Sequence, residues 1–220
     1  MEDIDAIAVL QDPVRRRLYE YVVAQGREVG RNEAAEGVGV ARTLAAHHLD
    51  RLTEAGLLES GSRRLTGRSG PGAGRPAKVY TRAPAERSVS LPGRDYRTAA
   101  ELLAEAAEEA GLDAGLCAAA RRRGEALRGP EGPRALEEAV ALLGARGYEP
   151  YLEEGEGAPV VRMRNCPFHA VAERFPPLVC GMNLALLEGL LGADGPVRAR
   201  MDARPGECCV VVEDSKNNDH

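Results

Sequence analysis

Residues 40–58 read VARTLAAHHLDRLTEAGLL, and this stretch decides the fold of the N-terminal part of the chain. The residues of one helix face recur here at intervals of three and four: Leu44, His48/Leu49, Leu52 and Ala55. Gly56 follows them, and glycine is typical just beyond a helix C-terminus. We therefore predict an amphipathic helix over residues 41–56.

Two more helices are predicted upstream of this stretch. Asp12 is an N-cap residue followed by Pro13 at the first helical position, and the helix should run to about Ala24. A shorter helix, NEAAEGV, is predicted to begin at an Asn32 cap and to stop at the glycines of residues 37–39. Two helices joined by a tight glycine-containing turn, the second of them amphipathic, are the signature of a helix-turn-helix.

A basic hairpin is predicted after the amphipathic helix. Residues 57–59 and 77–81 read as short strands on either side of the loop GSRRLTGRSGPGAGRP. Between residues 61 and 82 there are six basic residues and no acidic one. We expect phosphate contacts from Arg63, Arg64, Arg68, Arg75 and Lys78. We expect base-edge contacts from Arg42, Thr43 and His47 on the exposed side of the helix, with His48 turned inward.

The charge distribution agrees with nucleic-acid contact by one end of the chain. The net charge is −5, but residues 1–100 hold 16 Lys+Arg and 13 Asp+Glu, whereas the remaining residues hold 13 and 21. Such asymmetry favours a nucleic-acid-binding half. No apolar run approaches the roughly 18–20 residues of a membrane span, and the acidic N-terminus lacks the basic region of a signal peptide, so a cytoplasmic protein is expected.

Residues 12–82 resemble the winged-helix domain of the ArsR superfamily. The resemblance rests on HHLDRLTEAGLL at residues 47–58, followed by GRPAKVY at residues 74–80. It implies a regulator that binds double-stranded operator DNA as a homodimer, with no membrane partner and no enzymatic activity.

The fold class expected for the whole chain is α+β, in four parts. These are a winged helix-turn-helix over residues 1–83, a linker and helical dimerisation region over 84–146, a small α+β sensor domain over 147–214 and a disordered tail over 215–220. In the sensor domain, strands are predicted at 148–153, 160–163, 197–201 and 208–213, with helices at 166–174 and 179–191.

Four of the five cysteines lie in the predicted sensor domain, at residues 166, 180, 208 and 209. His169 is three residues after Cys166, so both can point to one side. Strand alternation should send Cys208 and Cys209 to opposite faces, so that only one of them easily joins the other ligands. Thiolates from three separate elements beside an imidazole form a soft ligand set that suits an iron–sulfur cluster or zinc. Simple packing of buried cysteines is the plain alternative.

The whole chain resembles the iron–sulfur cluster biosynthesis repressors, the SufR-like regulators. The resemblance rests on the predicted basic hairpin followed later in the chain by NCPFHAVAERFPPLVCGMN at residues 165–183 and CCV at residues 208–210. The resemblance implies a [4Fe-4S] cluster on Cys166, Cys180 and the Cys208/Cys209 pair, and repression of cluster-assembly genes by the loaded protein. His169, a carboxylate, a small thiol or an open iron site are the candidates for the fourth ligand position. A zinc-dependent ArsR-type regulator and a thiol–disulfide sensor using the same cysteines are the alternatives.

Overall fold

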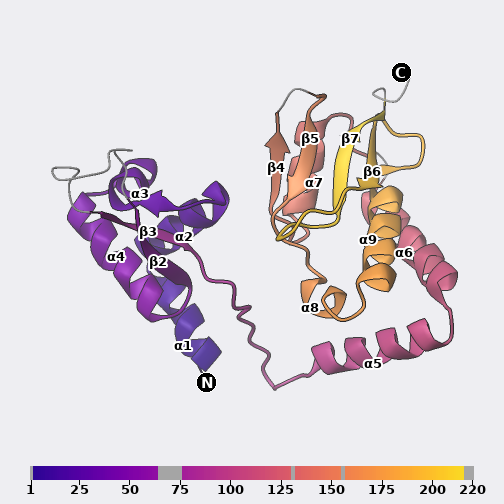
Figure 1. The fold of residues 1–220 in the computed structure, drawn as a ribbon, viewed down its shortest axis with the longest axis horizontal. Helices are drawn as coiled ribbons and strands as arrows, with labels where there is room; N and C mark the ends of the chain where they lie inside the picture. The colour runs from indigo at the N-terminus through magenta and orange to yellow at the C-terminus, as the bar shows by residue number, and fades with distance from the viewer. Residues whose placement is uncertain (1, 64–75, 130–131, 155–156, 216–220) are drawn as a thin grey trace. The chain divides into compact units, whose positions relative to one another are not determined.

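The computed structural model describes residues 2–63, 76–129, 132–154 and 157–215. The chain divides into two compact units, residues 1–94 and 95–220, where the sequence predicts three structured parts and a tail (Figure 1). The helices predicted between 84 and 146 belong to the second unit, because they pack on its sheet and on one another. None of the helices formed by the described residues is long and apolar enough to span a membrane.

The first unit contains helices and a small three-stranded sheet. Its helices are α1 (Glu2–Ala8), a short 3₁₀ helix (Val9–Gln11), α2 (Pro13–Gln25), α3 (Arg31–Val38) and α4 (Arg42–Glu54). Its strands are β1 (Val29–Gly30), β2 (Leu58–Arg63) and β3 (Ala77–Arg82), in the antiparallel order β1-β3-β2. The helices before Asp12 and the two-residue strand β1 were not predicted from the sequence, since neither segment has a recognisable periodicity.

Local signals explain where the helices of this unit begin and end. The carboxylate of Asp12 accepts hydrogen bonds from the backbone N–H groups of Val14 and Arg15, so it caps α2 as predicted. The short helix α3 begins at Arg31, with Gly30 rather than Asn32 at its N-cap. Gly56, with φ of 67°, adopts the left-handed conformation expected beyond α4.

The core of the first unit lies where α2, α3 and α4 meet β3. It includes Leu18, Val22, Leu49, Leu52 and Tyr80, all almost completely buried. The buried face of α4 begins at Ala45, so the prediction that Leu44 belongs to it was wrong: Leu44 is 41% exposed.

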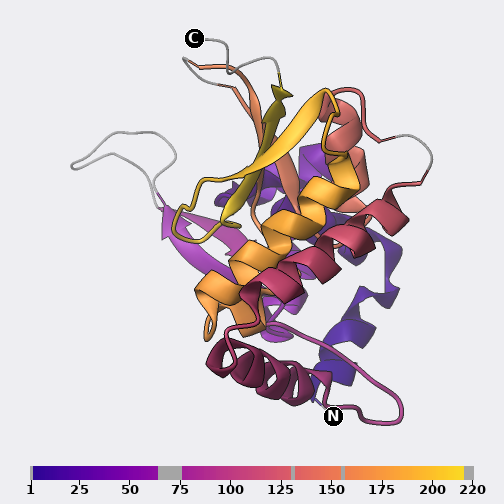
Figure 2. The same ribbon diagram turned by 90° about the vertical axis from the view of Figure 1, so that its right-hand side faces the viewer.

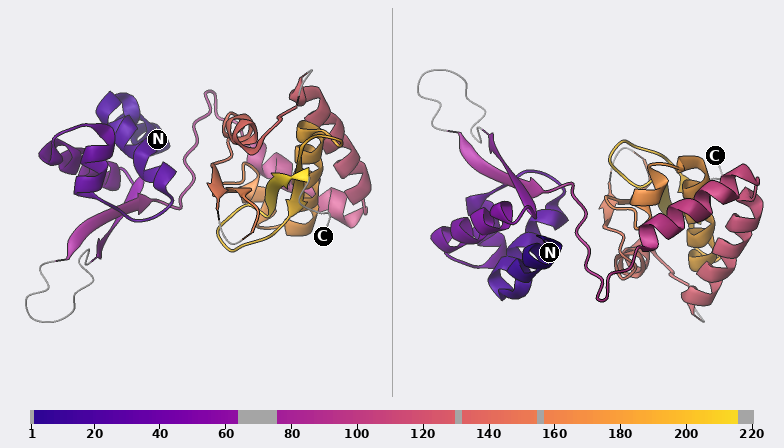
Figure 3. Two further views of the ribbon diagram at one scale, coloured as in Figure 1. Left: turned by 90° about the horizontal axis from the view of Figure 1, so that it is seen from above. Right: turned by 90° about the horizontal axis from the view of Figure 1, so that it is seen from below.

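The second unit places a four-stranded sheet against helices. Its helices are α5 (Tyr96–Glu109), α6 (Asp113–Arg128), α7 (Leu136–Gly144), α8 (His169–Ala172) and α9 (Pro176–Leu191). Its strands are β4 (Pro150–Glu153), β5 (Val160–Met163), β6 (Val197–Met201) and β7 (Val210–Asp214). All neighbouring strands are antiparallel, in the order β4-β5-β7-β6 (Figure 1). Figure 3 gives two further views of the unit.

One face of this sheet is apolar and the other is ionic. Side chains of β5, β6 and β7 at alternate positions pack against α7 and α9 to form the core. Arg162, between two core residues of β5, points to the opposite face and has carboxylate partners there.

Helix α6 packs along α9 on the side away from the sheet (Figure 2). The two helices approach so closely that a Cβ at Gly124 would lie 2.1 Å from the backbone oxygen of Leu186, and one at Gly189 would lie 2.1 Å from that of Arg121. Glycines at both positions therefore allow the contact.

The sequence predicts Ala99, Leu102, Leu103, Ala106 and Ala110 on one side of α5, which either builds a dimer interface or covers the core. In the structure, Ala104 faces the neighbouring helices, whereas Leu102 and Leu103 are 61% and 72% exposed. The most apolar side of α5 is thus uncovered in the single chain.

Candidate nucleic-acid interface and thiol cluster

The N-terminal turns of α4 present the residues predicted to read DNA bases. Arg42, Thr43 and His47 are exposed, and His48 is buried at 6% exposure, so the predicted orientation of the two histidines is found in the structure. Arg15 donates from Nε to Nδ1 of His48 at 3.3 Å, and burial lowers the pKa of His48. Its inward position supports the core, while His47 is left available to a ligand.

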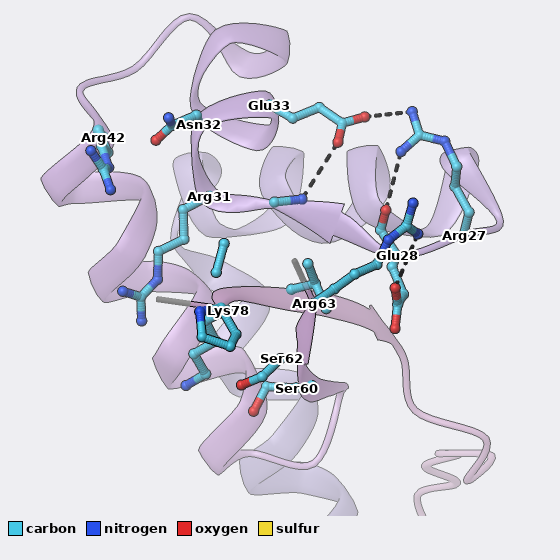
Figure 4. A pocket seen from close by; sticks show the side chains of 15 residues that line it. Arg27, Glu28, Arg31, Asn32, Glu33, Arg42, Ser60, Ser62, Arg63 and Lys78 are labelled. Atoms are coloured by element: carbon cyan, nitrogen blue, oxygen red, sulfur yellow. Dashed lines mark hydrogen bonds and ion pairs between the residues drawn. The ribbon is translucent and has the colours of Figure 1, made fainter. Parts of the chain in front are cut away.

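A cleft of about 1250 Å³ lies between the first residues of α3, Arg42 of α4 and the strands β2 and β3 (Figure 4). Its lining includes five basic side chains: Arg27, Arg31, Arg42, Arg63 and Lys78. Most of them are paired with carboxylates; Arg63, for example, lies 3.2 Å from Glu28. No carboxylate pairs with Arg42 among the residues that the structure describes, so its guanidinium is available to an external anion.

Of the predicted phosphate contacts, Arg63 and Lys78 flank this cleft. Arg64, Arg68 and Arg75 lie outside the described residues.

Asp50 on α4 binds side chains of β3. We call α4, the second helix of the helix-turn-helix, the recognition helix, and the hairpin of β2 and β3 the wing. Its Oδ1 accepts a hydrogen bond from the Tyr80 hydroxyl at 2.7 Å and lies 2.7 Å from Nζ of Lys78, and Arg31 approaches its Oδ2 at 3.3 Å. Although burial raises the pKa of Asp50, hydrogen bonds from Lys78 and Tyr80 lower it overall. Burial and the bond to Asp50 raise the pKa of Tyr80 to about 12, so the phenol stays protonated and donates. Sequence reasoning missed this connection, because nothing in HHLD indicates where the aspartate points.

The second candidate site is a cluster of thiols at one end of the C-terminal core. All five cysteines are free. Cys166 follows β5, Cys180 lies in the second turn of α9, and Cys208 and Cys209 immediately precede β7. The thiols are neighbours in the order Cys166–Cys208–Cys209–Cys180, each close enough to the next to shift its pKa. The structure therefore brings both members of the Cys208–Cys209 pair into contact with the other two thiols, where alternation along a strand predicted only one.

The contacts within the cluster shift the pKa values of the thiols in opposite directions. Hydrogen bonds from Cys166 and Cys209 lower the pKa of Cys208 to about 3, whereas the bond to Cys208 together with burial raises the pKa of Cys166 and of Cys209. The thiolate form is thus favoured at Cys208, where the neighbouring Cys166 and Cys209 and the backbone N–H of Val210 stabilise the negative charge.

His169 does not join the thiols. It is exposed at the start of α8, and its Nε2 lies 3.3 Å from Oε1 of Glu173. Cys166 and His169 do share one turn, in which the backbone N–H of His169 donates to the oxygen of Cys166 at 3.0 Å, but the imidazole lies beside Glu173 and is exposed to solvent.

A buried amide contacts the cluster from α9. Nδ2 of Asn183 donates to Sγ of Cys208 at 3.4 Å, and the Tyr148 hydroxyl donates to Oδ1 of Asn183 at 2.5 Å. Asn183 is completely buried and Tyr148 is 5% exposed. The tyrosine bond fixes which end of the amide faces the sulfur. An asparagine in the apolar run MNLALLEGLL at residues 182–191 was the signal in the sequence, because a polar side chain on a buried helix needs a partner.

The segment that delivers Cys208 and Cys209 is anchored to the ionic face of the sheet. Arg162, with 2% of its side chain exposed, binds Asp202 at 2.6 Å and Glu153 at 2.9 Å, and lies 3.7 Å from Glu207. Glu207 also accepts from the Tyr151 hydroxyl at 2.5 Å. Both ends of the segment 202–207 are thereby held before the chain reaches the thiols.

The described residues contain no group of three or more His, Cys, Asp or Glu side chains arranged around one point as ligands of a single metal ion. In a [4Fe-4S] cluster each of four cysteines binds a different iron, so the four sulfurs do not have to surround one metal ion. The four largely buried thiols from three elements have the number and the chemistry that such a cluster needs.

Residues 10–61 match a family model described as a helix-turn-helix domain. The match spans α2, α3, α4 and the start of β2, the elements that carry Arg42, Thr43, His47 and Asp50. It supports a DNA-binding transcriptional regulator, as the sequence predicted. Comparisons with curated proteins and with solved structures gave no match.

Proposed function

We propose that this chain is a homodimeric transcriptional repressor of iron–sulfur cluster assembly genes that senses cluster supply through its C-terminal cysteines. DNA binding by the first unit is supported by the helix-turn-helix match and by the basic cleft beside α4. The observation that carries the sensing function is the contact chain of Cys166, Cys208, Cys209 and Cys180.

The four thiols would hold a [4Fe-4S] cluster, and His169 would not be needed as the fourth ligand. A bound cluster would supply cross-links between the end of β5, helix α9 and the start of β7, and would make the order of the second unit depend on iron and oxygen. Asn183 would keep its N–H directed at the Cys208 sulfur, and Arg162 would hold the segment 202–207 in place.

The exposed apolar side of α5 supports the homodimer in this proposal. Tyr96, Leu102 and Leu103 are each more than half exposed, which is costly for a free helix face in water. A second copy covering this side would set the distance between two recognition helices, and an operator with two half-sites about one helical turn apart would match it. A cluster that orders the second unit would then tighten DNA binding by a coupling of about 1–3 kcal/mol.

The decisive experiment is anaerobic purification, followed by an absorption spectrum and by iron, sulfide and zinc analysis. We expect a coloured protein with about four irons and four sulfides per chain. The variants Cys166→Ser and Cys180→Ser should lose the cluster. Cys117→Ser, on α6 and outside the thiol chain, and His169→Asn should keep it. A colourless protein with stoichiometric zinc would refute the proposal in favour of a zinc-dependent regulator.

A thiol–disulfide sensor is the second candidate, because the thiolate form is favoured at Cys208 beside the Cys166 thiol. Oxidation by hydrogen peroxide would then form a Cys166–Cys208 disulfide: two electrons and the single S–H proton of Cys166 pass to the peroxide, which leaves as water and hydroxide. Peptide mapping after aerobic oxidation distinguishes the two: an intramolecular disulfide in a protein that never contains iron supports the sensor.

A further inference from the structure

Asp50 is an acidic residue at a surface that should attract phosphates. It lies on α4 three residues beyond His47, and its side chain is 40% exposed. Acidic side chains on a DNA-facing helix oppose association, because affinity for the duplex backbone comes from neutralised phosphates. The position therefore needs a physical reason other than affinity.

The contacts of Asp50 supply one. Its carboxylate engages Lys78 and Arg31, two of the five basic side chains of the cleft, and so reduces the positive charge that they present. It also accepts from the hydroxyl of Tyr80, which has no exposed surface and which in turn accepts from Nε of Arg31 at 2.9 Å. The wing strand β3 and the recognition helix are thus joined by one buried phenol and one shared carboxylate.

These contacts restrict the orientation of the wing relative to α4 more than the hairpin alone can. Lys78 and Tyr80 are two residues apart on β3, so both side chains project from the same face of the strand. Both bind Oδ1 of the same aspartate, at 2.7 Å. A rotation of β3 relative to α4 would break two short, partly buried bonds, one from a charged amine and one from the buried Tyr80 phenol.

We infer that Asp50 is a positioning residue that sets the specificity of DNA recognition: it fixes the wing relative to the recognition helix and lowers non-specific attraction to the duplex by holding Lys78 and Arg31. This inference rests on DNA binding by the first unit and not on the thiol cluster.

The test compares the full chain and three variants on two DNA probes. One probe is the duplex that the wild-type chain selects from a random pool, and the other is a scrambled duplex of the same length. Asp50→Asn keeps the shape but loses the charge. Tyr80→Phe keeps every charge and loses the bond. Glu54→Gln makes the same charge change on the same helix, at an exposed pair with Arg51, and is the matched control.

Affinity is measured by fluorescence anisotropy over a range of salt concentrations. Asp50→Asn should bind the scrambled duplex more tightly than wild type, and its slope of log K against log salt should steepen by up to about 0.9 for each cation that gains a phosphate. Tyr80→Phe should leave that slope unchanged but lower the ratio of selected to scrambled affinity by about tenfold, the loss expected for one buried hydrogen bond. Glu54→Gln should resemble wild type in the affinity ratio.

The outcomes separate this inference from DNA binding itself. If the wild-type chain selects no duplex, DNA recognition by this unit is refuted, and the role of Asp50 with it. If the wild type discriminates between the probes, and Asp50→Asn and Tyr80→Phe discriminate equally well, the positioning role alone is refuted. If Glu54→Gln changes the slope and the ratio as Asp50→Asn does, the effect is one of total charge and the role of Asp50 is again refuted.

Discussion

Replacing Gly124 with alanine should separate α6 from α9 and destabilise the second unit. The added Cβ would lie 2.1 Å from the oxygen of Leu186 and 2.7 Å from the nitrogen of Leu190, both backbone atoms of the partner helix. Ordinary van der Waals contact begins near 3.4 Å. Because backbone atoms cannot rotate away, the helices must move apart by roughly 1 Å along this crossing, which disturbs a close-packed interior on both sides.

The expected loss is at the upper end of the range for overpacked interiors, about 3 kcal/mol. That is a large share of the roughly 5–15 kcal/mol by which domains are stable, and it corresponds to about 10 °C in Tm. Gly115 on the same helix is the matched control, since a Cβ there meets no atom within 4 Å. Gly115→Ala should be neutral or stabilising by up to about 0.5 kcal/mol, because alanine restricts the unfolded chain more than glycine.

The assay is urea unfolding of the full chain followed by far-ultraviolet circular dichroism, with hydrogen exchange of α6 and α9 to assign the loss to the second unit. Since α9 carries Cys180, Gly124→Ala should also hold less iron than Gly115→Ala after anaerobic purification. Equal unfolding free energies for the two variants would show that the helices do not cross as closely as the structure indicates.

Three further predictions concern buried polar groups. Arg162→Met leaves its carboxylate partners without their cation and should lower the free energy of unfolding by about 3 kcal/mol in urea titrations; a stability equal to wild type would contradict its anchoring role. Tyr148→Phe removes a buried donor to the amide that faces Cys208 and should cost about 1–2 kcal/mol in the same assay, with an unchanged value arguing that the phenol is not bound. Burial lowers the pKa of His48 in the folded chain, so the unfolded chain binds more protons below about pH 6.5 and stability should fall as the pH drops. His48→Gln should flatten this fall in thermal melts at about pH 7.5 and 5.5, whereas His47→Gln should retain it; the reverse result would refute the assignment.

Local signals in the sequence determined much of the secondary structure. The Asp12–Pro13 start of α2, the strands at Val160–Met163 and Val197–Met201 and the left-handed Gly56 each depend on a few neighbouring residues, and each was found where the pattern predicts it. The helix-turn-helix was predictable for the same reason, since its two helices and their turn form one contiguous segment, and residues 10–61 match that domain.

Tertiary structure decided which side chains from distant segments of the chain contact one another. Periodicity places Leu102 and Leu103 on one side of α5 but cannot say whether that side covers the core or meets a second copy, and the single chain leaves both side chains exposed. The pairing of Asp50 with Tyr80 depends on β3 returning past α4. The joining of Cys166, Cys180, Cys208 and Cys209 depends on β5, α9 and β7 meeting at one end of the core. Spacing along the chain named these cysteines as candidates, but only the packing of three elements brings both Cys208 and Cys209 to the other thiols and leaves His169 in solvent.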